Sequence, residues 1–465
     1  MYSNAVINTL PIIKLMKNTT LIPLLSIVMC GIIQAAPATK SKTMKVESMI
    51  FNKKLWETKL ADFAKKHESR GFEYMSSAKN AVRSEGRGFK FFKLEAGEVV
   101  IRADKGLITS ANIFLYNRGD NGDMKLRQFE KIYQNAVSKL TKVTGEEPKD
   151  LSGKSAVDLT RMIWMWENTA ILLEKSVSGK GSKAEFLRIR MKAKNARSEG
   201  IANRSSLRSN VVKDRASGDV FINNVPMVDQ GKKGYCAVAS AARIYQYYGL
   251  ETDQHVLAQI AGTGPNSGTS LGEMVASLKK VTRHVRSRVL VVYEYPKGLA
   301  DKTLDNDSSY QDYDRIIRNY NLGLKEYARD IKKYNKLAKK KGKQTFPDDP
   351  DRSVVNIQEF ALKCDPEIYR EVMTAKSSYS RFINKIEEYV DQGIPVGWCL
   401  QLGMFKEGEL PQMFGGHMRL IIGYNEKTKE IIYTDSWGAG HAKKRMKVAD
   451  AFCMSNALLA LPPNK

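Results

Sequence analysis

The chain has 465 residues, which is long for one domain and predicts two or three. Hydrophobic residues make up 42% of the chain, so it can bury a core. Its formal net charge of +25 favours contact with anionic surfaces or polymers, although a well-solvated basic surface explains the charge equally well. No zinc-ribbon, RNA-binding or helix-turn-helix signature accompanies this charge, so nucleic-acid recognition has no specific support.

The first 38 residues have the pattern of a signal peptide. Two lysines precede an apolar run over residues 21–33, and residues 36–38 (Ala-Pro-Ala) fit the small-x-small cleavage pattern. The run is short for a membrane helix, so we expect a secreted or periplasmic protein with no transmembrane span after cleavage. Met29 is too large for the residue before a lipidated cysteine, which argues against lipoprotein anchoring at Cys30.

Residues 39–193 are predicted to form a small α+β domain of unknown role. Amphipathic spacing predicts helices and alternation predicts strands; the helices are expected over 55–66 and 125–143, and the strands over 89–94, 98–103, 107–116, 161–167, 170–176 and 184–191. We expect an antiparallel sheet with helices on one side. Its only histidine, His67, lies among lysines and glutamates and is expected to be a solvated surface residue. Binding, targeting and inhibition remain open as roles for this domain.

Residues 194–219 are polar and rich in Arg, Ser and Asn, which predicts a flexible basic linker. An exposed basic linker could also be a processing site that releases the following domain.

A second domain is predicted over residues 220–465, and its first motif surrounds Cys236. Glycines at 231 and 234 allow a tight loop before Cys236, and an apolar helical run follows it up to Gly249. Cys236 then lies in the first turn of a helix, where unpaired N–H groups and the helix dipole stabilise a thiolate. Gln230 lies six residues earlier and could donate its amide to a developing oxyanion, together with the Cys236 backbone N–H.

A helical insertion is predicted at about residues 296–380. Within it, two sets of apolar residues recur every seven positions, offset by three: Tyr310, Ile317, Leu324, Ile331 and Ala338, and Tyr313, Tyr320, Tyr327 and Tyr334. This heptad pattern predicts one long helix over residues 308–341. We expect the helix to pack on the catalytic domain; the alternative is an arm that contacts a partner or restricts access to the site.

A second motif places His417 before an apolar strand and Asp435 after the next one. A hairpin about residues 426–427 puts His417 opposite residue 435 or 436, within one residue of register. Asp435 could therefore orient the His417 imidazole for base catalysis near neutral pH. His441 is an alternative base, but it lacks a carboxylate on a paired strand.

These residues together resemble the papain-like cysteine peptidases. The Gln-Gly-x-x-Gly-x-Cys run, the His before a strand ending in Gly-Tyr, and Asp-Ser-Trp-Gly at 435–438 are similar to that family's segments in the same order. Asp435 in place of the usual Asn is closer to the bacteriocin-processing (double-glycine leader) branch. The resemblance covers about residues 220–460 and implies an α+β catalytic domain in which the nucleophile helix packs on an antiparallel sheet. Lys233, Ala237 and the insertion at 296–380 depart from the pattern.

The resemblance implies a peptide or protein substrate and a catalytic set of Cys236, His417, Asp435 and Gln230, with no cofactor and no metal. The leading hypothesis is hydrolysis of peptide or isopeptide bonds through an acyl-enzyme. Two alternatives remain open: a non-catalytic papain-fold module that binds a cell-surface partner, and an amidase or transpeptidase acting on cell-wall peptides.

Four cysteines remain once the signal peptide is removed, too few for a disulfide-stapled scaffold of this size. With Cys236 as a free nucleophile, at most one disulfide can form among the other three. Cys399 lies in an apolar stretch and is expected to be a buried thiol.

Overall fold

The computed structural model describes residues 44–463, apart from 77, 85–87, 154–156, 180, 195–203, 232–233, 251, 264–270, 285–286, 302–308, 348–356, 409 and 411–413. The predicted signal peptide therefore lies outside the described residues. So do residues 195–203 of the proposed linker, and Lys233. Within the described ranges, no helix is both long enough and apolar enough to cross a membrane.

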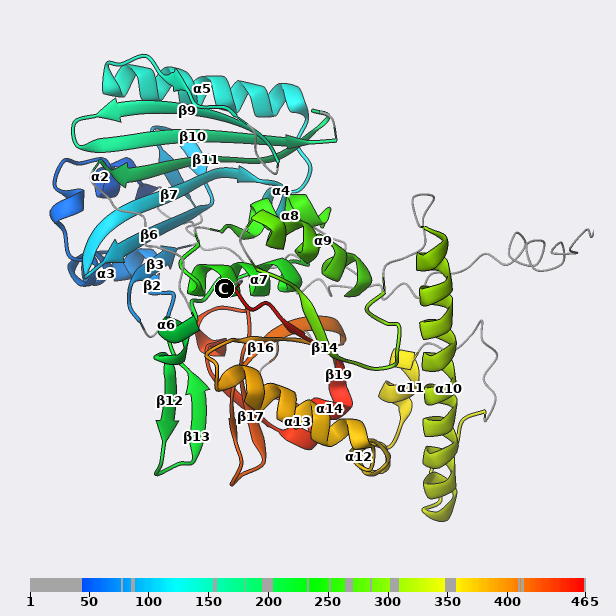
Figure 1. Cartoon of the computed structure of the whole chain (residues 1–465). Helices are drawn as coiled ribbons and strands as arrows, with labels where there is room; N and C mark the ends of the chain where they lie inside the picture. The colour runs from blue at the N-terminus through cyan, green and yellow to red at the C-terminus, as the bar shows by residue number, and fades with distance from the viewer. Residues whose placement is uncertain are drawn as a thin grey trace, which may run out of the picture.

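An antiparallel sheet dominates the N-terminal part (Figure 1). Its strands run in the order β2-β3-β6-β7-β11-β10-β9-β8, with β2 at Glu73–Tyr74, β3 at Ala81–Ser84, β6 at Glu98–Asp104, β7 at Leu107–Asn117, β8 at Lys149–Asp150, β9 at Asp158–Trp166, β10 at Thr169–Ser178 and β11 at Lys183–Ala193. A smaller sheet joins β1 (Met44–Lys45), β4 (Phe89–Phe91) and β5 (Leu94–Ala96).

Helices cover this sheet with their apolar faces. The longest, α5 (Leu126–Thr144), buries Phe129, Tyr133 and Leu140 and ends at Gly145 in the left-handed conformation. The others are α2 (Glu47–Ile50), η1 (Leu55–Glu57), α3 (Leu60–His67), η2 (Glu68–Arg70) and α4 (Arg118–Asn121). Most of the predicted strands and helices are present with shifted ends, but two predictions were wrong. The helix predicted over 55–66 is a 3-10 turn (η1) followed by α3, and the strand predicted over 89–94 is the β4–β5 hairpin.

His67 differs from its prediction as a surface residue. It is 6% exposed and packs against Phe63 and Phe72 at the end of α3. Burial, followed by the charges of Arg70 and Lys66, lowers the pKa of His67 to about 4. The charged neighbours in the sequence were misleading, because the imidazole lies on the apolar face of an amphipathic helix.

The second antiparallel sheet lies in the C-terminal part. Its strands run β12-β13-β16-β15-β19-β14, with β17 paired to β16 and β18 paired to β17. Their bounds are β12 Val211–Asp214, β13 Asp219–Ile222, β14 Leu290–Glu294, β15 Val396–Leu402, β16 Gly415–Asn425, β17 Glu430–Thr434, β18 Lys444–Lys447 and β19 Ser455–Ala460. Helices and strands alternate along the chain with antiparallel pairing, which is an α+β arrangement.

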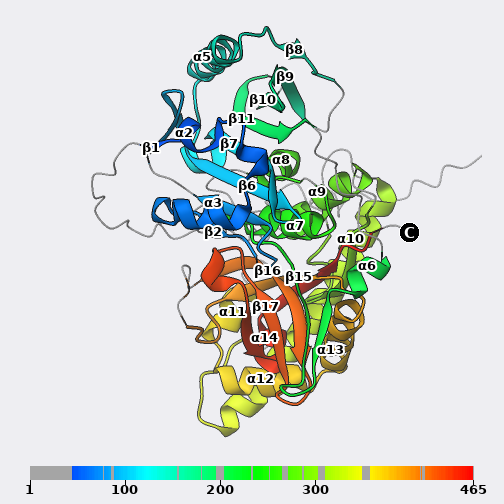
Figure 2. The ribbon, with the colours of Figure 1, turned by 90° about the vertical axis from the view of Figure 1, so that its left-hand side faces the viewer.

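The C-terminal part also contains several helices. They are α6 (Arg204–Arg208), α7 (Cys236–Tyr247), α8 (Gln254–Ala261), α9 (Leu271–His284), α10 (Tyr310–Lys340), α11 (Ile357–Lys363), α12 (Pro366–Thr374), α13 (Ser377–Val390), η3 (Ala439–His441) and α14 (Val448–Met454). Of these, α7, α13 and α14 contact strands of the second sheet. Figures 1 and 2 show α7 and α8 between the two large sheets. Helix α7 is buried almost all round, so it contacts apolar groups on several sides at once.

Residues 204–222 have more regular structure than a flexible linker. They contain α6 and the β12–β13 hairpin, which extends the second sheet through pairing of β13 with β16. Gly423 on β16 allows this pairing, because a Cβ there would lie 2.5 Å from the Val220 carbonyl oxygen. The predicted boundary of the second domain at residue 220 remains a prediction.

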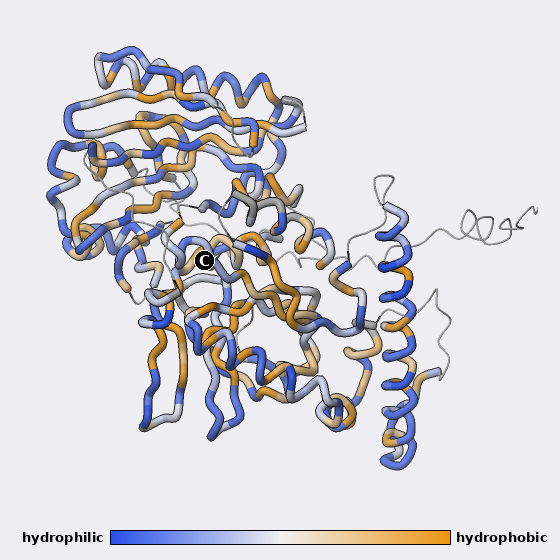
Figure 3. The backbone as a smooth tube through the Cα atoms, viewed as in Figure 1, coloured by the Kyte–Doolittle hydropathy of each residue, from blue (hydrophilic) through white to orange (hydrophobic). Residues whose placement is uncertain are grey.

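The chain forms two large apolar cores, each built from a different part of the sequence. One joins buried residues between Val46 and Met191, and the other joins residues between Leu207 and Leu461. Figure 3 shows orange, hydrophobic segments in the strands of both sheets. The four described cysteines are free thiols; Cys364, Cys399 and Cys453 are buried, and Cys236 is partly exposed.

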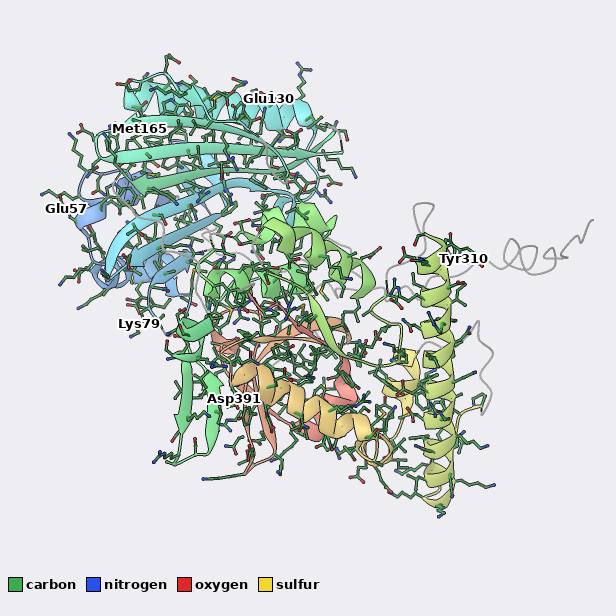
Figure 4. All side chains as sticks on the ribbon, in the orientation of Figure 1. Glu57, Lys79, Glu130, Met165, Tyr310 and Asp391 are labelled. Atoms are coloured by element: carbon green, nitrogen blue, oxygen red, sulfur yellow. The ribbon has the colours of Figure 1, made fainter. Side chains whose placement is uncertain are left out.

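Helix α10 is one continuous helix of 31 residues, close to the bounds that the heptad pattern predicts. Ser309 caps its N-terminus in a capping box with Asp312. Its C-terminal half buries Tyr327, Ile331 and Tyr334, whereas Tyr310 at the other end is 81% exposed (Figure 4). The helix therefore packs on the second core through half of its length.

Candidate active site

Cys236 is the first residue of α7, as its position after the glycine loop predicts. Its thiol is partly exposed, while the helix behind it is buried. The first N–H groups of a helix have no partner within the helix, so the local field at Cys236 favours an anion. Cys236 therefore combines a position at a helix N-terminus with a partly exposed side chain.

Two polar side chains of α7 hold the helix against the hairpin that carries His417. Ser240 donates its hydroxyl to the Met418 carbonyl at 3.2 Å, one turn after Cys236. Arg243, which is 1% exposed, donates to the Asp435 carbonyl at 2.8 Å and to Thr434 Oγ1 at 2.6 Å. These bonds hold α7 against Met418, which follows His417, and against Thr434 and Asp435.

His417 and Asp435 meet across the β16–β17 hairpin. His417 Nε2 lies 2.7 Å from Asp435 Oδ1, and both side chains are almost fully buried. Leu420 pairs with Thr434 in this hairpin, so the strand end brings residue 435 next to the face that carries His417. The structure thus brings together the two residues that the hairpin register predicted to be neighbours.

Cys236 lies close enough to His417 to affect its protonation. Asp435 contacts Nε2, so Nδ1 is the ring nitrogen left for the thiol. Burial by itself lowers the pKa of His417, but the charge and hydrogen bond of Asp435, together with Cys236, raise it to about 9. An imidazolium at neutral pH stabilises a neighbouring thiolate, as an ion pair of this kind requires.

Asp435 is fixed by more than His417. Its Oδ2 accepts from Arg419 Nε at 2.7 Å, and its Oδ1 also accepts from the Ser436 N–H at 2.8 Å. Burial would raise the pKa of Asp435, but His417 and Arg419 hold it well below its usual range. The carboxylate is therefore ionised and held in one orientation.

Arg419 continues the charged row away from the thiol. It is 0% exposed and donates from Nη1 to Glu407 Oε2 at 2.8 Å, an oxygen that also accepts from the Tyr433 hydroxyl. Its guanidinium lies 4.7 Å from the centre of the Tyr433 ring. Each buried charge in the row thus has an opposite charge beside it, as burial requires.

Trp437 covers the His417 ring. The two rings stack with centroids 4.2 Å apart and planes 13° apart. His441, the alternative base, lies on the far side of Trp437, with its ring at 5.8 Å from that indole. Its backbone carbonyl accepts from the Asp435 N–H, so His441 supports the turn, while His417 is the histidine beside Cys236.

Gln230 lies in the same cluster, 2% exposed. Its backbone N–H donates to the Ser436 carbonyl, and its Oε1 accepts from the Ser436 hydroxyl at 2.7 Å. This bond sets which end of the amide is the oxygen and leaves the NH₂ end as the donor. The residue after Asp435 thereby links the Gln230 loop to the His417 hairpin.

Sequence reasoning did not single out Arg243, Arg419 or Ser240. A signal was present for the two arginines, because each is a lone charge inside an otherwise apolar segment that is predicted to be buried. Such a residue needs a polar partner, and both partners here lie at Asp435.

A family comparison places this hairpin in a known context. Residues 325–457 match the model of the Peptidase_C39 like family. The matched segment is similar to papain-like cysteine peptidases of the C39, bacteriocin-processing type. Among curated proteins, the chain has no significant match.

The Peptidase_C39-like segment contains His417 and Asp435 but begins after Gln230 and Cys236. It also contains Arg419 and most of α10, so the heptad helix lies partly within the matched region. The similarity suggests a cysteine peptidase, and the contacts of α7 supply a thiol beside the matched histidine.

Proposed function

We propose that this protein is an exported cysteine peptidase that hydrolyses peptide or isopeptide bonds through a thioester intermediate. One observation carries the proposal: a partly exposed cysteine at a helix N-terminus lies near enough to a buried histidine to raise its pKa, and Nε2 of that histidine contacts a buried aspartate at 2.7 Å. The export rests on the residues of the N-terminus alone.

In this mechanism the Cys236 thiolate attacks the carbonyl carbon of the scissile bond, and a C–S bond forms. The protonated His417 gives its Nδ1 proton to the leaving amine as the C–N bond breaks. His417 then takes a proton from water as the water oxygen attacks the thioester; the C–S bond breaks, the acid is released, and the Cys236 thiolate and protonated His417 are restored. Asp435 keeps Nε2 protonated throughout, because its carboxylate is fixed by Arg419 and by the Ser436 N–H.

The negative charge on the substrate oxygen needs donors during both attacks. The Cys236 backbone N–H and the Gln230 side-chain amide are the proposed donors. The Ser436 hydroxyl supports this role by holding the Gln230 oxygen, which keeps the amide in one orientation. The reaction requires no cofactor.

This geometry favours catalysis over the non-catalytic binding module. A binding module has no need for a buried histidine–aspartate pair beside an accessible thiol, because burying those charges without the surrounding partners is unfavourable. The proposed substrate is a peptide or a protein, and cell-wall peptides belong to the same chemical class.

The test compares Cys236→Ala with Cys399→Ala, which removes a buried thiol from β15. Each variant and the wild-type protein is given p-nitrophenyl acetate, a small acyl donor, and the release of p-nitrophenolate is followed. Cleavage of fluorescently labelled casein is measured in parallel. We expect Cys236→Ala to lose at least about a thousandfold in acylation, and Cys399→Ala to remain close to wild type.

Intact-mass analysis after treatment with iodoacetamide provides a second readout. For the protein without its predicted signal peptide, which contains Cys30, we expect one adduct in the wild type and in Cys399→Ala, and none in Cys236→Ala, because the other thiols that the structure describes are buried. Unchanged acylation and labelling in Cys236→Ala would remove Cys236 from the mechanism and refute the proposal.

A further inference from the structure

The N-terminal sheet contacts the loop that leads to the candidate nucleophile. The Met227 N–H donates to the Met75 carbonyl at 2.7 Å, next to β2. Both side chains are buried in a small apolar cluster with Ala81 and Val100. This cluster joins strands of the N-terminal sheet to a loop of the C-terminal part, three residues before Gln230.

A partly buried ion pair reaches the same loop. Arg83 on β3 donates from Nε to Glu98 at 2.5 Å, and its Nη1 lies 3.3 Å from Asp229 Oδ2. The Arg83 side chain is 12% exposed and that of Asp229 is 23% exposed, so both charges are partly shielded from water. Asp229 directly precedes Gln230, the proposed oxyanion donor.

Asp229 also shapes the local backbone. Its Oδ1 accepts from the Gly231 N–H at 2.8 Å, across Gln230. Its Oδ2 lies so near Gly438 that a Cβ on that glycine would be 3.1 Å away, and Gly438 has a φ of +89°. The Asp229 carboxylate therefore lies where the Gln230 loop meets the turn after Trp437.

The start of α7 is held from the same side. Tyr235, the residue before Cys236, is 3% exposed, and its ring centre lies 5.9 Å from that of His255. The His255 ring lies 5.0 Å from Phe114 on β7, and its Nε2 lies 3.9 Å from Glu98. The carboxylate that holds Arg83 thus also faces the histidine behind Tyr235.

We propose that the N-terminal sheet is a permanent scaffold for the oxyanion loop and that Arg83 is a positioning residue for Gln230. The inference rests on the proposed function. A releasable inhibitory segment would contact the reactive side chains. The N-terminal sheet instead contacts Met227 and Asp229 of the loop, and the residues behind Tyr235. The neighbours of His417, which are Cys236, Asp435 and Trp437, all belong to the C-terminal part.

The physical argument is that Arg83 bridges two carboxylates with the fork of one guanidinium. Glu98 fixes the arginine on the N-terminal sheet, and Asp229 fixes the loop. Removing the arginine removes the side chain that joins Glu98 on β6 to Asp229 in the loop, so we expect the loop to shift. Catalysis by a positioned donor is sensitive to displacements of about 1 Å.

The experiment uses the full chain and compares Arg83→Gln with Arg102→Gln. Arg102, on β6, donates to Gln246 at 3.0 Å, so it crosses the same interface at the far end of α7 from Cys236. Each variant removes an arginine of the N-terminal sheet that contacts a residue of the C-terminal part, Asp229 for Arg83 and Gln246 for Arg102. Acylation by p-nitrophenyl acetate and alkylation by iodoacetamide are measured for each protein.

The two probes respond differently to the oxyanion donor. Acylation builds negative charge on a carbonyl oxygen, whereas alkylation displaces iodide at a saturated carbon and builds none. We expect Arg83→Gln to lower the acylation rate roughly 10- to 100-fold, a fraction of the effect of deleting an oxyanion donor, with alkylation unchanged. Arg102→Gln should leave both rates within about twofold of wild type.

A loss of stability in Arg83→Gln would lower its acylation rate for a second reason. The conservative variant Arg83→Lys, alone and combined with Gln230→Ala, separates the two effects. Arg83→Lys retains the charge but not the fork, and should lose several-fold in acylation with a wild-type unfolding midpoint. In a Gln230→Ala background, Arg83→Lys should have little further effect, because it acts through Gln230.

Equal acylation rates for the Arg83 and Arg102 variants would overturn the scaffold proposal, as would full additivity with Gln230→Ala. Either outcome leaves the proposed function intact provided that Cys236→Ala abolishes acylation. If Cys236→Ala acylates like wild type, the proposed function itself fails.

Discussion

Four charged side chains form a buried row that begins beside the candidate nucleophile. His417, Asp435, Arg419 and Glu407 contact one another in that order, with 2.7 Å between His417 and Asp435 and 2.8 Å between Arg419 and Glu407. Alternating signs make such a row tolerable in a core, because each charge is paired. The row therefore sets the protonation state of His417 and holds its orientation.

The raised pKa of His417 predicts how stability depends on pH. A histidine pKa raised from 6.5 to about 9 means that the folded state holds its proton more tightly than the unfolded state. The resulting stabilisation is complete below pH 6.5, decreases as the pH rises to about 9, and amounts to roughly 3 kcal/mol. Urea unfolding of the wild type and His417→Gln near pH 6 and pH 10 measures this difference.

His417→Gln keeps all the other titrating groups, so its own pH dependence measures their contribution to stability. The wild type should lose more stability than His417→Gln over this pH interval. Parallel curves for the two proteins would show that His417 has an ordinary pKa in the fold.

At the scale of elements, α7 is held to the hairpin by Arg243. Its guanidinium satisfies the carbonyls of Pro226 and Asp435 and the hydroxyl of Thr434. Burial lowers the pKa of Arg243 to about 10, which leaves it charged at neutral pH. One side chain thus joins the Gln230 loop, the nucleophile helix and the base–acid hairpin.

Replacing Arg243 by Met should destabilise the protein by about 3 kcal/mol or more. The substitution leaves three buried acceptors without their donor, and each unmade bond costs about 1–3 kcal/mol. Chemical unfolding of Arg243→Met measures the loss, and Lys213→Met, at an exposed position with a 67% accessible side chain, is a suitable control. A loss equal to that of the control would contradict the assigned contacts.

Helix α10 allows a matched comparison of two tyrosines from its heptad pattern. Tyr334 is 1% exposed, contacts Phe346 and Phe360, and accepts from the Asp365 N–H, whereas Tyr310 is 81% exposed. Tyr334→Ala should cost about 3–5 kcal/mol because it leaves a cavity. Tyr310→Ala should change the free energy of unfolding by no more than about 0.5 kcal/mol. Similar losses for both variants would mean that the exposed half is also packed.

At the scale of the whole molecule, the net charge of +25 predicts attraction to anionic surfaces. We expect the protein to sediment with phosphatidylserine-containing vesicles at about 50 mM NaCl and to be released at about 500 mM, because salt screens such contacts. Vesicles of phosphatidylcholine alone are the control. Binding to both vesicle types, or binding that resists salt, would rule out a simple electrostatic attraction.

The N-terminal sheet also contacts helix α8 of the C-terminal part. Ser176 donates to Gln259 Oε1 at 2.6 Å, and Arg188 lies 3.2 Å from Asp253, so polar bonds cross between β10, β11 and the region of α8. Together with the Arg83–Asp229 pair, these contacts join the N-terminal sheet to the C-terminal part from β3, β10 and β11.

The sequence by itself determined the local features of this protein. Periodicity predicted α5, α10 and the principal strands, and the spacing of glycines and turns placed Cys236 at the head of a helix and His417 beside residue 435. Each of these depends on residues that are close in the chain, where the repeat of a helix or a strand directly sets which side chains share a face.

Only the tertiary structure decided the rest. The burial of His67, the bridges made by Arg243 and Arg419, and the contact of Arg83 with Asp229 join residues that are distant in sequence. A polar residue in an apolar segment shows that a partner is needed, but the identity of that partner depends on how the sheets and helices pack. The charges that orient the candidate site are of this second kind.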